Sequence, residues 1–296
     1  MTESVCAIVV TYKRKVLLTE CLAAVLSQTH PVTSILVIDN ASNDGTADLF
    51  ASDAPDPRIR YVRLDNNLGG AGGFHKGLEL ASEGTAEWFW LMDDDTVAKP
   101  DALAELISAW QRFPIEQKPR VLASKVEWTD GSLHPMNFPT IRRASTNREW
   151  AILAAQNSTL WVRWASFVSL LLHRSVVKDF GLPFADYFIW NDDTEDTARI
   201  LREELGVLVP ASVVVHKTPR PHGPQDASPE RSYYQVRNVL WMILRSDAWT
   251  PDEKVKIGLI HLQWILRYLA RSPFRADRLR AVFRGLRDGL VREPAR

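Results

Sequence analysis

Three consecutive carboxylates follow an apolar run in the first half of the chain. Asp93, Asp94 and Asp95 come directly after WFWLM at positions 88–92. Adjacent carboxylates repel one another, and burial beside an apolar strand raises the cost of their charges. Mg²⁺ or Mn²⁺ removes that cost, because both ions prefer carboxylate oxygens. The triplet therefore predicts a divalent-cation site, and an acidic loop that caps a helix is the alternative.

A second group of acids lies at 190–196, in the run WNDDTED. A helix dipole favours acids in its first turn, so a structural role competes with a chemical one. These acids exceed what capping needs, and we expect one of Asp192, Asp193 and Glu195 to act as a general base. His216 closes the apolar run VVV, where it is either a structural histidine or a further ligand of the cation.

A glycine-rich segment, NNLGGAGGF, occupies positions 66–74. Glycines let a backbone approach a ligand closely, and amides at a helix start suit phosphate, although tight turns also use glycine. Gly69 and Gly70 are the candidate contacts. The segment fits neither the dinucleotide fingerprint nor the Walker loop, which counts against dehydrogenases and kinases. Asp39 ends another apolar run, where it accepts a hydrogen bond from a base or ribose or forms an Asx-turn.

The elements that position these residues alternate between strands and helices. Apolar runs at 5–11, 34–38, 59–64 and 88–92 predict buried strands, and helical spacing at 17–28 and 73–83 predicts the crossovers. This order predicts an α/β fold with a mostly parallel sheet flanked by helices. Ligands gather at the carboxyl ends of such strands, where Asp39 and the acidic triplet stand.

The second half is less regular. We expect helices at 101–110, 173–179 and 194–205, strands at 167–172 and 207–215, and loops or a hairpin at 128–140. A proline-rich loop at 219–229 is a candidate lid, and helices follow from 232 onward. We therefore divide the chain into a ligand-binding domain at 1–217 and a C-terminal region at 218–296 that holds the lid and a helical appendage.

The 36 Lys and Arg residues balance 36 Asp and Glu residues, which argues against a nucleic-acid binder. The two cysteines, Cys6 and Cys21, lie in no metal-ligand or redox pattern. The first residues are typical of a strand rather than a signal peptide, and no uncharged apolar segment is long enough to span a bilayer. We expect a protein in the cytoplasm or attached to the inner face of a membrane.

The tail from 254 onward mixes basic with apolar and aromatic residues. Helices of this composition are typical of segments that lie on anionic lipid, and a helix packed on the core or a subunit interface is the alternative. The basic residues are Lys256, Arg267, Arg271, Arg275, Arg278, Arg280, Arg284 and Arg287.

Together these motifs resemble the inverting GT-A glycosyltransferases of family 2. VVTYKR, VIDNASNDGT and LMDDD match the nucleotide-binding half of that family. NLGGAGGF, FIWNDDTEDTAR, VVVH and YYQVRN are similar to its galactofuranosyltransferase branch, the enzymes of actinobacterial cell-wall galactan. The resemblance covers about residues 5–244 and implies the Rossmann-like GT-A fold.

The resemblance implies a role for each motif. In the donor site, Thr11 and Asp39 would hold the uridine, Asn67 would lie beside the nucleotide, and Asp94 would face the sugar. Asp93, Asp95 and His216 would ligate Mn²⁺ or Mg²⁺. Asp193 would be the catalytic base, with Glu195 as the alternative, and Arg237 would lie near the diphosphate or the acceptor entrance.

The acceptor side departs from the galactan-polymerising members. Those carry a Gly-Trp-Trp platform before the central apolar strand, whereas this chain has Trp164 followed by Ala-Ser-Phe. Trp164 and Trp190 are the candidate acceptor contacts. The short chain suits an initiating or single-addition enzyme.

The resemblance implies metal-dependent, inverting transfer of galactofuranose from UDP-galactofuranose to a hydroxyl of a polyprenyl-linked glycan. This would take place at the inner face of the plasma membrane, in cell-wall or surface polysaccharide synthesis. The alternatives are a rhamnosyl- or other hexosyltransferase that uses a TDP- or UDP-sugar, a sugar-phosphate nucleotidyltransferase, and a binding module that has lost catalysis. VVTYKR lacks the glycines of a nucleotidyltransferase, and the acids at 192–195 argue against lost catalysis.

Overall fold

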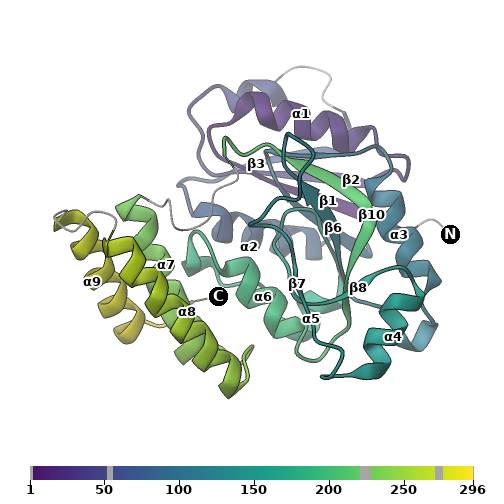
Figure 1. Cartoon of the computed structure of the whole chain (residues 1–296). Coiled ribbons are helices and arrows are strands. Elements are labelled where there is room, and N and C mark those ends of the chain that lie inside the picture. Colours follow the sequence, from purple (N-terminus) through teal and green to yellow (C-terminus); the bar gives the residue numbers. More distant parts are fainter. Residues whose placement is uncertain (1–2, 52–55, 221–227, 271–275, 296) are drawn as a thin grey trace.

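The computed structural model of the chain describes residues 3–51, 56–220, 228–270 and 276–295. A sheet flanked by helices forms the larger part, and three C-terminal helices lie together at one side of it (Figure 1). In chain order the strands are β1 (Val5–Thr11), β2 (Ser34–Asp39), β3 (Ile59–Arg63), β4 (Trp88–Asp93), β5 (Thr96–Ala98), β6 (Val121–Glu127), β7 (Thr140–Ile141), β8 (Leu160–Trp164), β9 (Leu170–His173) and β10 (Gly206–His216).

The first six helices lie between strands in the sequence, and the last three follow β10. They are α1 (Lys15–Leu26), α2 (Gly69–Ser82), α3 (Ala102–Arg112), α4 (Arg148–Gln156), α5 (Ser175–Phe180), α6 (Asp192–Ile200), α7 (Pro229–Leu244), α8 (Pro251–Ala270) and α9 (Ala276–Val291). Short 3₁₀ turns occupy Thr46–Phe50, Ile115–Gln117 and Ala185–Tyr187. No helix within the described residues is long and apolar enough to cross a bilayer.

The sheet runs in the order β3-β2-β1-β4-β9-β6-β10-β8-β7, with β5 paired to β10 off this path. Strands β3, β2, β1 and β4 pair in parallel, as the alternating strand and helix pattern predicts. Strand β9 is antiparallel to both β4 and β6, and β10 is parallel to β6 but antiparallel to β5 and β8. The α/β fold with a flanked sheet is thus confirmed, and the mixed pairing belongs to the irregular second half.

Alternate residues of β1 enter two different cores, because side chains of a strand point to opposite faces. Val5, Ala7 and Val9 pack with α1 and α3 on one face. Cys6, Ile8 and Val10 pack with α2, α5 and α6 on the other. A strand covered on both faces must be apolar throughout, which explains the continuous run in the sequence.

Helix α2 begins at Gly69, four residues earlier than the predicted 73–83, so the glycine-rich segment is its first turn. A Cβ atom at Gly73 would lie 2.4 Å from Val10 Cγ1, and one at Gly77 would lie 2.4 Å from Ile8 Cγ2. These glycines therefore let α2 lie directly against β1, a packing role that the phosphate interpretation of the segment did not include.

The C-terminal helices are joined to the sheet domain by an aromatic cluster. Trp241 and Met242 of α7 pack with Ala71 of α2, with Tyr187 of the 3₁₀ turn Ala185–Tyr187 and with Ala198 of α6, and Trp249 extends the cluster. Helix α9 crosses α7 closely, since a Cβ at Gly285 would lie 2.8 Å from Val236 Cβ. The predicted helical appendage is confirmed, and most of the loop predicted at 219–229 lies outside the described residues.

Candidate functional site

The acidic triplet reaches His216 through the pairing of two strands. Asp93 ends β4, a tight turn follows, and β5 then runs antiparallel to β10 with Thr96 opposite His216. The backbone N–H of Lys217 donates to the carbonyl of Asp95 at 2.8 Å, which fixes this register. Residues more than 120 positions apart are thereby held at the same edge of the sheet.

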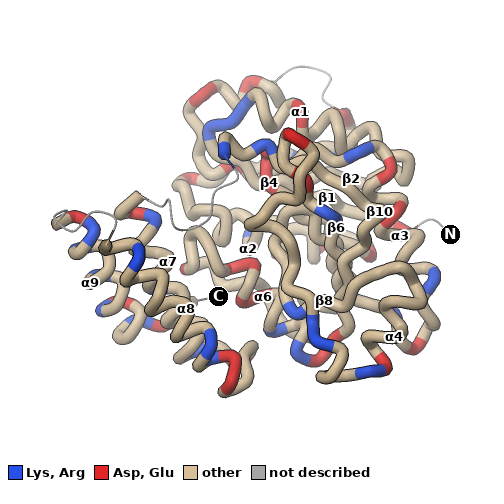
Figure 2. The backbone as a smooth tube through the Cα atoms, in the orientation of Figure 1, with Lys and Arg blue, Asp and Glu red and all other residues tan. Residues whose placement is uncertain are grey.

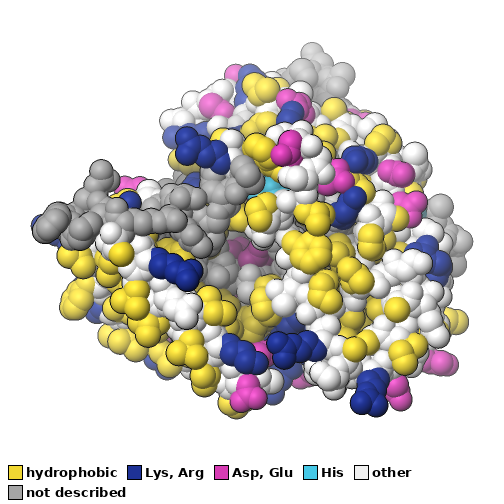
Figure 3. Space-filling view, viewed as in Figure 1, with side chains coloured by type: hydrophobic (Ala, Val, Ile, Leu, Met, Phe, Trp, Pro, Cys, Tyr) yellow, Lys and Arg dark blue, Asp and Glu magenta, His cyan; other side chains and the backbone are white. Residues whose placement is uncertain are grey.

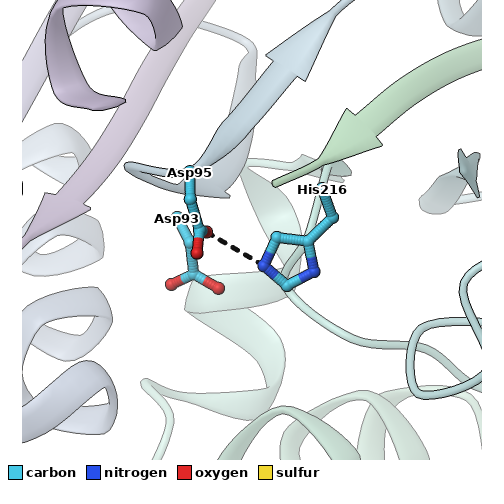
Figure 4. Close-up of side chains that lie close together, drawn as sticks. All are labelled: Asp93, Asp95 and His216. Atoms are coloured by element: carbon cyan, nitrogen blue, oxygen red, sulfur yellow. Dashed lines mark ion pairs between the residues drawn. The ribbon is translucent and has the colours of Figure 1, made fainter. Parts of the chain in front are cut away.

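Asp93, Asp95 and His216 form one cluster. One potential ligand atom from each lies within 4.8 Å of the other two, and the Asp95 and His216 side chains are buried. Figure 4 shows the carboxylates of Asp93 and Asp95 together on one side of the His216 imidazole. Asp95 Oδ1 lies 2.9 Å from His216 Nε2. Two carboxylates and one imidazole make a donor set suited to Mn²⁺ or Mg²⁺. The three predicted ligands are therefore together.

Asn137 sets the orientation of His216. Its Nδ2 donates to Ser166 Oγ at 3.1 Å, so its Oδ1 faces His216 Nδ1 at 2.8 Å. Because an amide oxygen only accepts, we assign the Nδ1 proton to this hydrogen bond. In the neutral imidazole, Nε2 then presents its lone pair toward Asp95. The tautomer that binds a metal through Nε2 is the one that Asn137 selects.

A cation fits between these groups. Asp95 Oδ1 is fully buried, and the partner that it faces among the described residues is His216 Nε2 at 2.9 Å. A lone pair and a carboxylate oxygen at that distance repel each other unless a proton or a metal ion shares them. A buried carboxylate oxygen that faces the lone pair of a nitrogen is an arrangement that a metal ion can bridge.

The electrostatics of the triplet follow from burial. Burial, reinforced by the charge of Asp95, raises the pKa of Asp93 to about 7. Burial likewise raises the pKa of Asp94 to about 6, against the opposing effect of Arg14. Burial acts to lower the pKa of His216, but the hydrogen bond and charge of Asp95 outweigh it, so that the pKa is raised. Without a metal, proton binding by these groups therefore offsets the negative charge that a cation would otherwise neutralise.

Asp94 points away from its two neighbours. Its carboxylate accepts from Thr11 Oγ1 at 2.7 Å and from the N–H of Tyr12 at 3.3 Å, and it pairs with Arg14 Nη1 at 3.3 Å. Asp94 is 3% exposed and its contacts tie β1 to β4, while its predicted contact with the donor sugar stays a prediction. Arg14 also contacts Asp95, and it thus neutralises part of the triplet.

The other predicted donor residues lie at the ends of neighbouring strands or at the start of α2. Asp39 ends β2 beside Thr11, and its carboxylate accepts from the N–H of Ser42 at 2.9 Å and from Tyr61 Oη at 2.5 Å. Asn67 Oδ1 accepts from the N–H of Gly69 at 2.8 Å, which closes the first turn of α2. A Cβ at Gly70 would meet nothing within 4 Å, so Gly70 faces open space.

Helix α6 brings two acids toward the metal cluster. It begins at Asp192, two residues before the predicted 194, and ends at Ile200 rather than 205. Burial raises the pKa of Asp192 well above its usual value, and the charges of Asp193 and Asp93 add to this effect. The effect of the Asp93 charge indicates that Asp192 lies near the triplet. Burial also raises the pKa of the half-buried Asp193, whose Oδ1 accepts from the N–H of Thr194.

Glu195 and Arg237 have structural partners. Glu195 is 1% exposed, pairs with Arg199 at 3.3 Å and accepts from Ser246 Oγ at 2.8 Å. Arg237 donates to the carbonyls of Asp186 and Tyr187 at 2.6 and 3.1 Å. Glu195 therefore anchors α6 to the chain after α7, and Arg237 holds the loop before α6, while their predicted roles in the reaction stay predictions. These contacts favour Asp193 over Glu195 as the base.

That loop is strained and is held by Asn238. Phe188, Trp190 and Asn191 all adopt left-handed conformations, with φ between 61° and 67°. The Asn238 side-chain amide donates to the carbonyls of Tyr187, Ile189 and Trp190 at 2.8–3.0 Å. Such strain persists only where surrounding contacts over-determine it. Asn238 thus helps to fix the position of the acids that begin α6.

The two predicted acceptor tryptophans lie on different elements. Trp164 ends β8 and packs edge-on against Trp249 at 5.4 Å, as part of the aromatic cluster under α7. Trp190 lies in the strained loop, with the guanidinium of Arg231 5.9 Å from its ring centre. Figure 3 shows acidic side chains in a hollow between the C-terminal helices and the sheet domain. Whether either tryptophan meets an acceptor there stays a prediction.

Comparison with known proteins identifies the family of this chain. The family model described as Glycosyl transferase family 2 matches residues 6–163. The chain belongs to glycosyl transferase family 2. The family match ends at β8, so the acids of α6 and His216 lie beyond it. The glycosyltransferase is 30% identical to galactofuranosyltransferase GlfT1 of Mycolicibacterium smegmatis over 206 residues, or 69% of this chain and 67% of the relative.

A second curated relative matches over more of its length. The glycosyltransferase is 25% identical to the N-acetylglucosaminyl-diphospho-decaprenol L-rhamnosyltransferase of Mycobacterium tuberculosis, over 95% of this chain and 97% of the relative. Among solved structures, Staphylococcus aureus TarS 1-349 with UDP-GlcNAc has a TM-score of 0.64 at 17% identity, over 97% of this chain and 80% of that one.

The mannosyltransferase PcManGT of Pyrobaculum calidifontis, solved with GDP-Man and Mn²⁺, has a TM-score of 0.59 at 16% identity, over 98% of this chain and 88% of that one. At these identities the two structures show a shared fold, which confirms the predicted GT-A architecture. The resemblance to family 2 and to its galactofuranosyltransferases is confirmed as well.

Sequence reasoning missed three residues that organise the site. Arg14 and Asn238 stand inside quoted motifs, VVTYKR and YYQVRN, so each had a signal in a motif that was otherwise used. Asn137 lies in the loop between β6 and β7 and matches no motif. Its hydrogen bond to His216 spans 79 positions of the chain and is visible only in three dimensions.

The raised pKa of Asp93 predicts how stability depends on pH without metal. With a folded-state pKa of about 7 against an unfolded value near 3.8, the folded state binds the extra proton. Stability is therefore lost as pH rises from about 4 through 7. Asp93→Asn removes this loss, so in EDTA at pH 8 we expect its melting temperature to exceed that of the wild type, by about 2–4 °C for each kcal/mol of stability regained.

Thermal unfolding at pH 5 and pH 8 measures this difference. The gap between Asp93→Asn and wild type should shrink at pH 5, where the folded wild type is already protonated. Asp101→Asn, which alters an exposed carboxylate, is the control. An equal gap at both pH values would contradict the assignment.

Proposed function

We propose that this glycosyltransferase transfers galactofuranose from UDP-galactofuranose to a hydroxyl of a polyprenyl-linked glycan, with inversion, in cell-wall or surface polysaccharide synthesis. The observation that carries the proposal is the cluster of Asp93, Asp95 and His216 at the carboxyl edge of the sheet, with the α6 acids facing it. The 30% identity to galactofuranosyltransferase GlfT1 supports the sugar. Family membership favours glycosyl transfer over nucleotidyl transfer.

Asp93, Asp95 and His216 would hold Mn²⁺ or Mg²⁺, and the Mn²⁺ in the mannosyltransferase neighbour supports such a site in this fold. When bound, the cation neutralises diphosphate charge that develops as the nucleotide departs. UDP-GlcNAc and UDP in the TarS structures support a UDP-sugar as donor. We assign the uridine to the edge formed by Thr11 and Asp39, beside Asn67, Gly69 and Gly70.

Asp193 acts as the general base. Its carboxylate takes the proton from the acceptor hydroxyl while that oxygen forms a bond to the anomeric carbon. The bond from this carbon to the diphosphate oxygen breaks, and its electron pair leaves with the nucleotide. Attack opposite to the departing group inverts the anomeric configuration. Burial raises the pKa of Asp193 and makes its carboxylate a better match for this proton transfer.

A rhamnosyltransferase that uses TDP-rhamnose is the second candidate. The match to the decaprenol-linked rhamnosyltransferase covers 95% of this chain and 97% of that relative, whereas the match to GlfT1 covers 69% and 67%. End-to-end correspondence supports a similar overall architecture, and the higher local identity supports galactofuranose. Either donor would use the same proposed metal cluster and the same proposed base.

We place the reaction at the inner face of the plasma membrane, in the cytoplasm. The decaprenol-linked substrate in the name of the rhamnosyltransferase supports a lipid-linked acceptor, which resides in a membrane. Residues 1–217 would bind donor and metal, and residues 218–296 would carry the lid and the peripheral membrane contact. Trp164 and Trp190 remain the acceptor candidates.

A donor screen tests the proposed reaction. Purified full-length protein with Mn²⁺ should release UDP from UDP-galactofuranose in the presence of a lipid-linked rhamnosyl or galactosyl acceptor. Release of TDP from TDP-rhamnose alone would move the assignment to the second candidate. Release from neither donor, with every acceptor tried, would contradict both.

Replacing the proposed base tests the mechanism. Asp193→Asn keeps the shape of the side chain but removes its basicity, so we expect kcat to fall by about 10²–10⁴-fold. The Kd for UDP with Mn²⁺ should stay within about twofold, since Asp193 is not among the proposed metal or uridine contacts. Asp186→Asn, at an exposed position, is the matched control. A near-normal kcat in Asp193→Asn would show that another group is the base.

Replacing Asn137 tests the metal site without turnover. Asn137→Leu removes the acceptor that holds His216 Nδ1–H, so the Kd for Mn²⁺ should rise about 10–100-fold. Asn137→Asp restores an acceptor and should bind nearly as the wild type does. Ser166→Ala removes the other partner of Asn137 and serves as the control. Calorimetry or Mn²⁺ electron paramagnetic resonance without donor measures this, and an unchanged Kd in Asn137→Leu would exclude the role.

A further inference from the structure

The outer face of α8 carries a continuous apolar stripe. Val255, Leu259, Leu262 and Leu266 follow one another at intervals of four, three and four residues, so they lie along one side of the helix. Their exposed fractions are 63%, 57%, 53% and 59%. On the opposite side, His261 and Tyr268 are buried, and Tyr268 packs with Val236 of α7 and Val282 of α9. Helix α8 is thus apolar on the face that it turns to the solvent as well as on the face that it packs.

Helix α9 repeats this arrangement. Leu279, Phe283 and Leu290 are 52%, 72% and 56% exposed and also lie at intervals of four and seven residues. Its buried side, which includes Ala281, Gly285 and Gly289, packs on α7. The inner residues of α8 and α9 meet in one hydrophobic cluster, so the two helices are neighbours. Figure 3 shows hydrophobic side chains gathered over the C-terminal helices.

Basic side chains border both apolar stripes. Lys256 and Arg267 follow residues of the α8 stripe by one position and are exposed, as Arg280 and Arg284 do on α9, and the exposed Arg287 lies three positions before Leu290. Figure 2 shows Lys and Arg positions spread along both helices. Long basic side chains lay their aliphatic stems along apolar surface and keep the charge at its edge. An apolar strip with a basic border complements the acyl boundary and the headgroups of an anionic bilayer.

We propose that the outer faces of α8 and α9 dock this protein on an anionic lipid surface. The inference assigns residues to the membrane association proposed above, and its test needs no turnover. Exposed apolar patches of this extent mark interaction sites. A second copy of the chain fits less well, because a symmetric contact through this face would bring the arginines of both copies together.

Sedimentation with vesicles tests the docking face on the full chain. Wild type should pellet with vesicles of phosphatidylcholine and phosphatidylglycerol, less with phosphatidylcholine alone, and less at high salt. Leu259→Gln with Leu262→Gln and Leu266→Gln should lower the partition coefficient at least about tenfold, since these side chains no longer enter the bilayer. Ile115→Gln, which changes a side chain 86% exposed on the sheet domain, should bind as the wild type does.

A second variant separates the charge from the apolar contribution. Lys256→Gln with Arg267→Gln and Arg280→Gln should abolish the preference for phosphatidylglycerol and leave the weak binding to phosphatidylcholine unchanged. Equal sedimentation of wild type and both variants would overturn the proposal. So would a wild-type dimer in light scattering that the leucine variant converts to a monomer without any effect on vesicles. Melting temperatures and UDP binding confirm that every variant is folded and that donor binding is separate.

Discussion

The contact between Asp95 and His216 is the interaction on which the site depends. It places the Asp95 carboxylate, just after β4, beside the imidazole at the end of β10. Both groups are buried, and a buried charge is destabilising unless an opposite charge or a hydrogen bond compensates it. Arg14 offsets part of that charge in the protein alone. A divalent cation would offset the rest, which couples donor binding to the electrostatics of the fold. The antiparallel pairing of the three-residue strand β5 with β10 makes this contact possible.

The proposed base, Asp193, is positioned by a different part of the chain. It stands at the start of α6, after a loop in which three residues other than glycine adopt left-handed conformations. Side chains from α7, Arg237 and Asn238, bind the carbonyls of that loop and hold it in place. Helix α7 therefore helps to fix the position of the residues that begin α6. The outer surface of α8 and α9 takes no part in these contacts, and its apolar and basic pattern suits an anionic membrane.

The glycines of α2 show how one pattern can satisfy two requirements. Gly73 and Gly77 bring the helix against β1, where even a methyl group would collide with Val10 or Ile8. Gly70 instead faces open space at the start of the helix. Packing against β1 thus explains Gly73 and Gly77. A ligand has room to approach the backbone at Gly70, at the start of the helix near Asn67.

The sequence by itself determined the α/β class, the first four strands and the acidic triplet, because local periodicity and adjacent residues encode all three. It also indicated His216 and the α6 acids, through motifs that end or begin an element. Only the tertiary structure decided how the three acids point, because Asp93 and Asp95 turn toward His216 while Asp94 turns toward Thr11. The roles of Asn137, Glu195 and Arg237 were likewise decided in three dimensions. Their partners lie 79, 51 and 51 positions away, and no local pattern records a contact across such a distance.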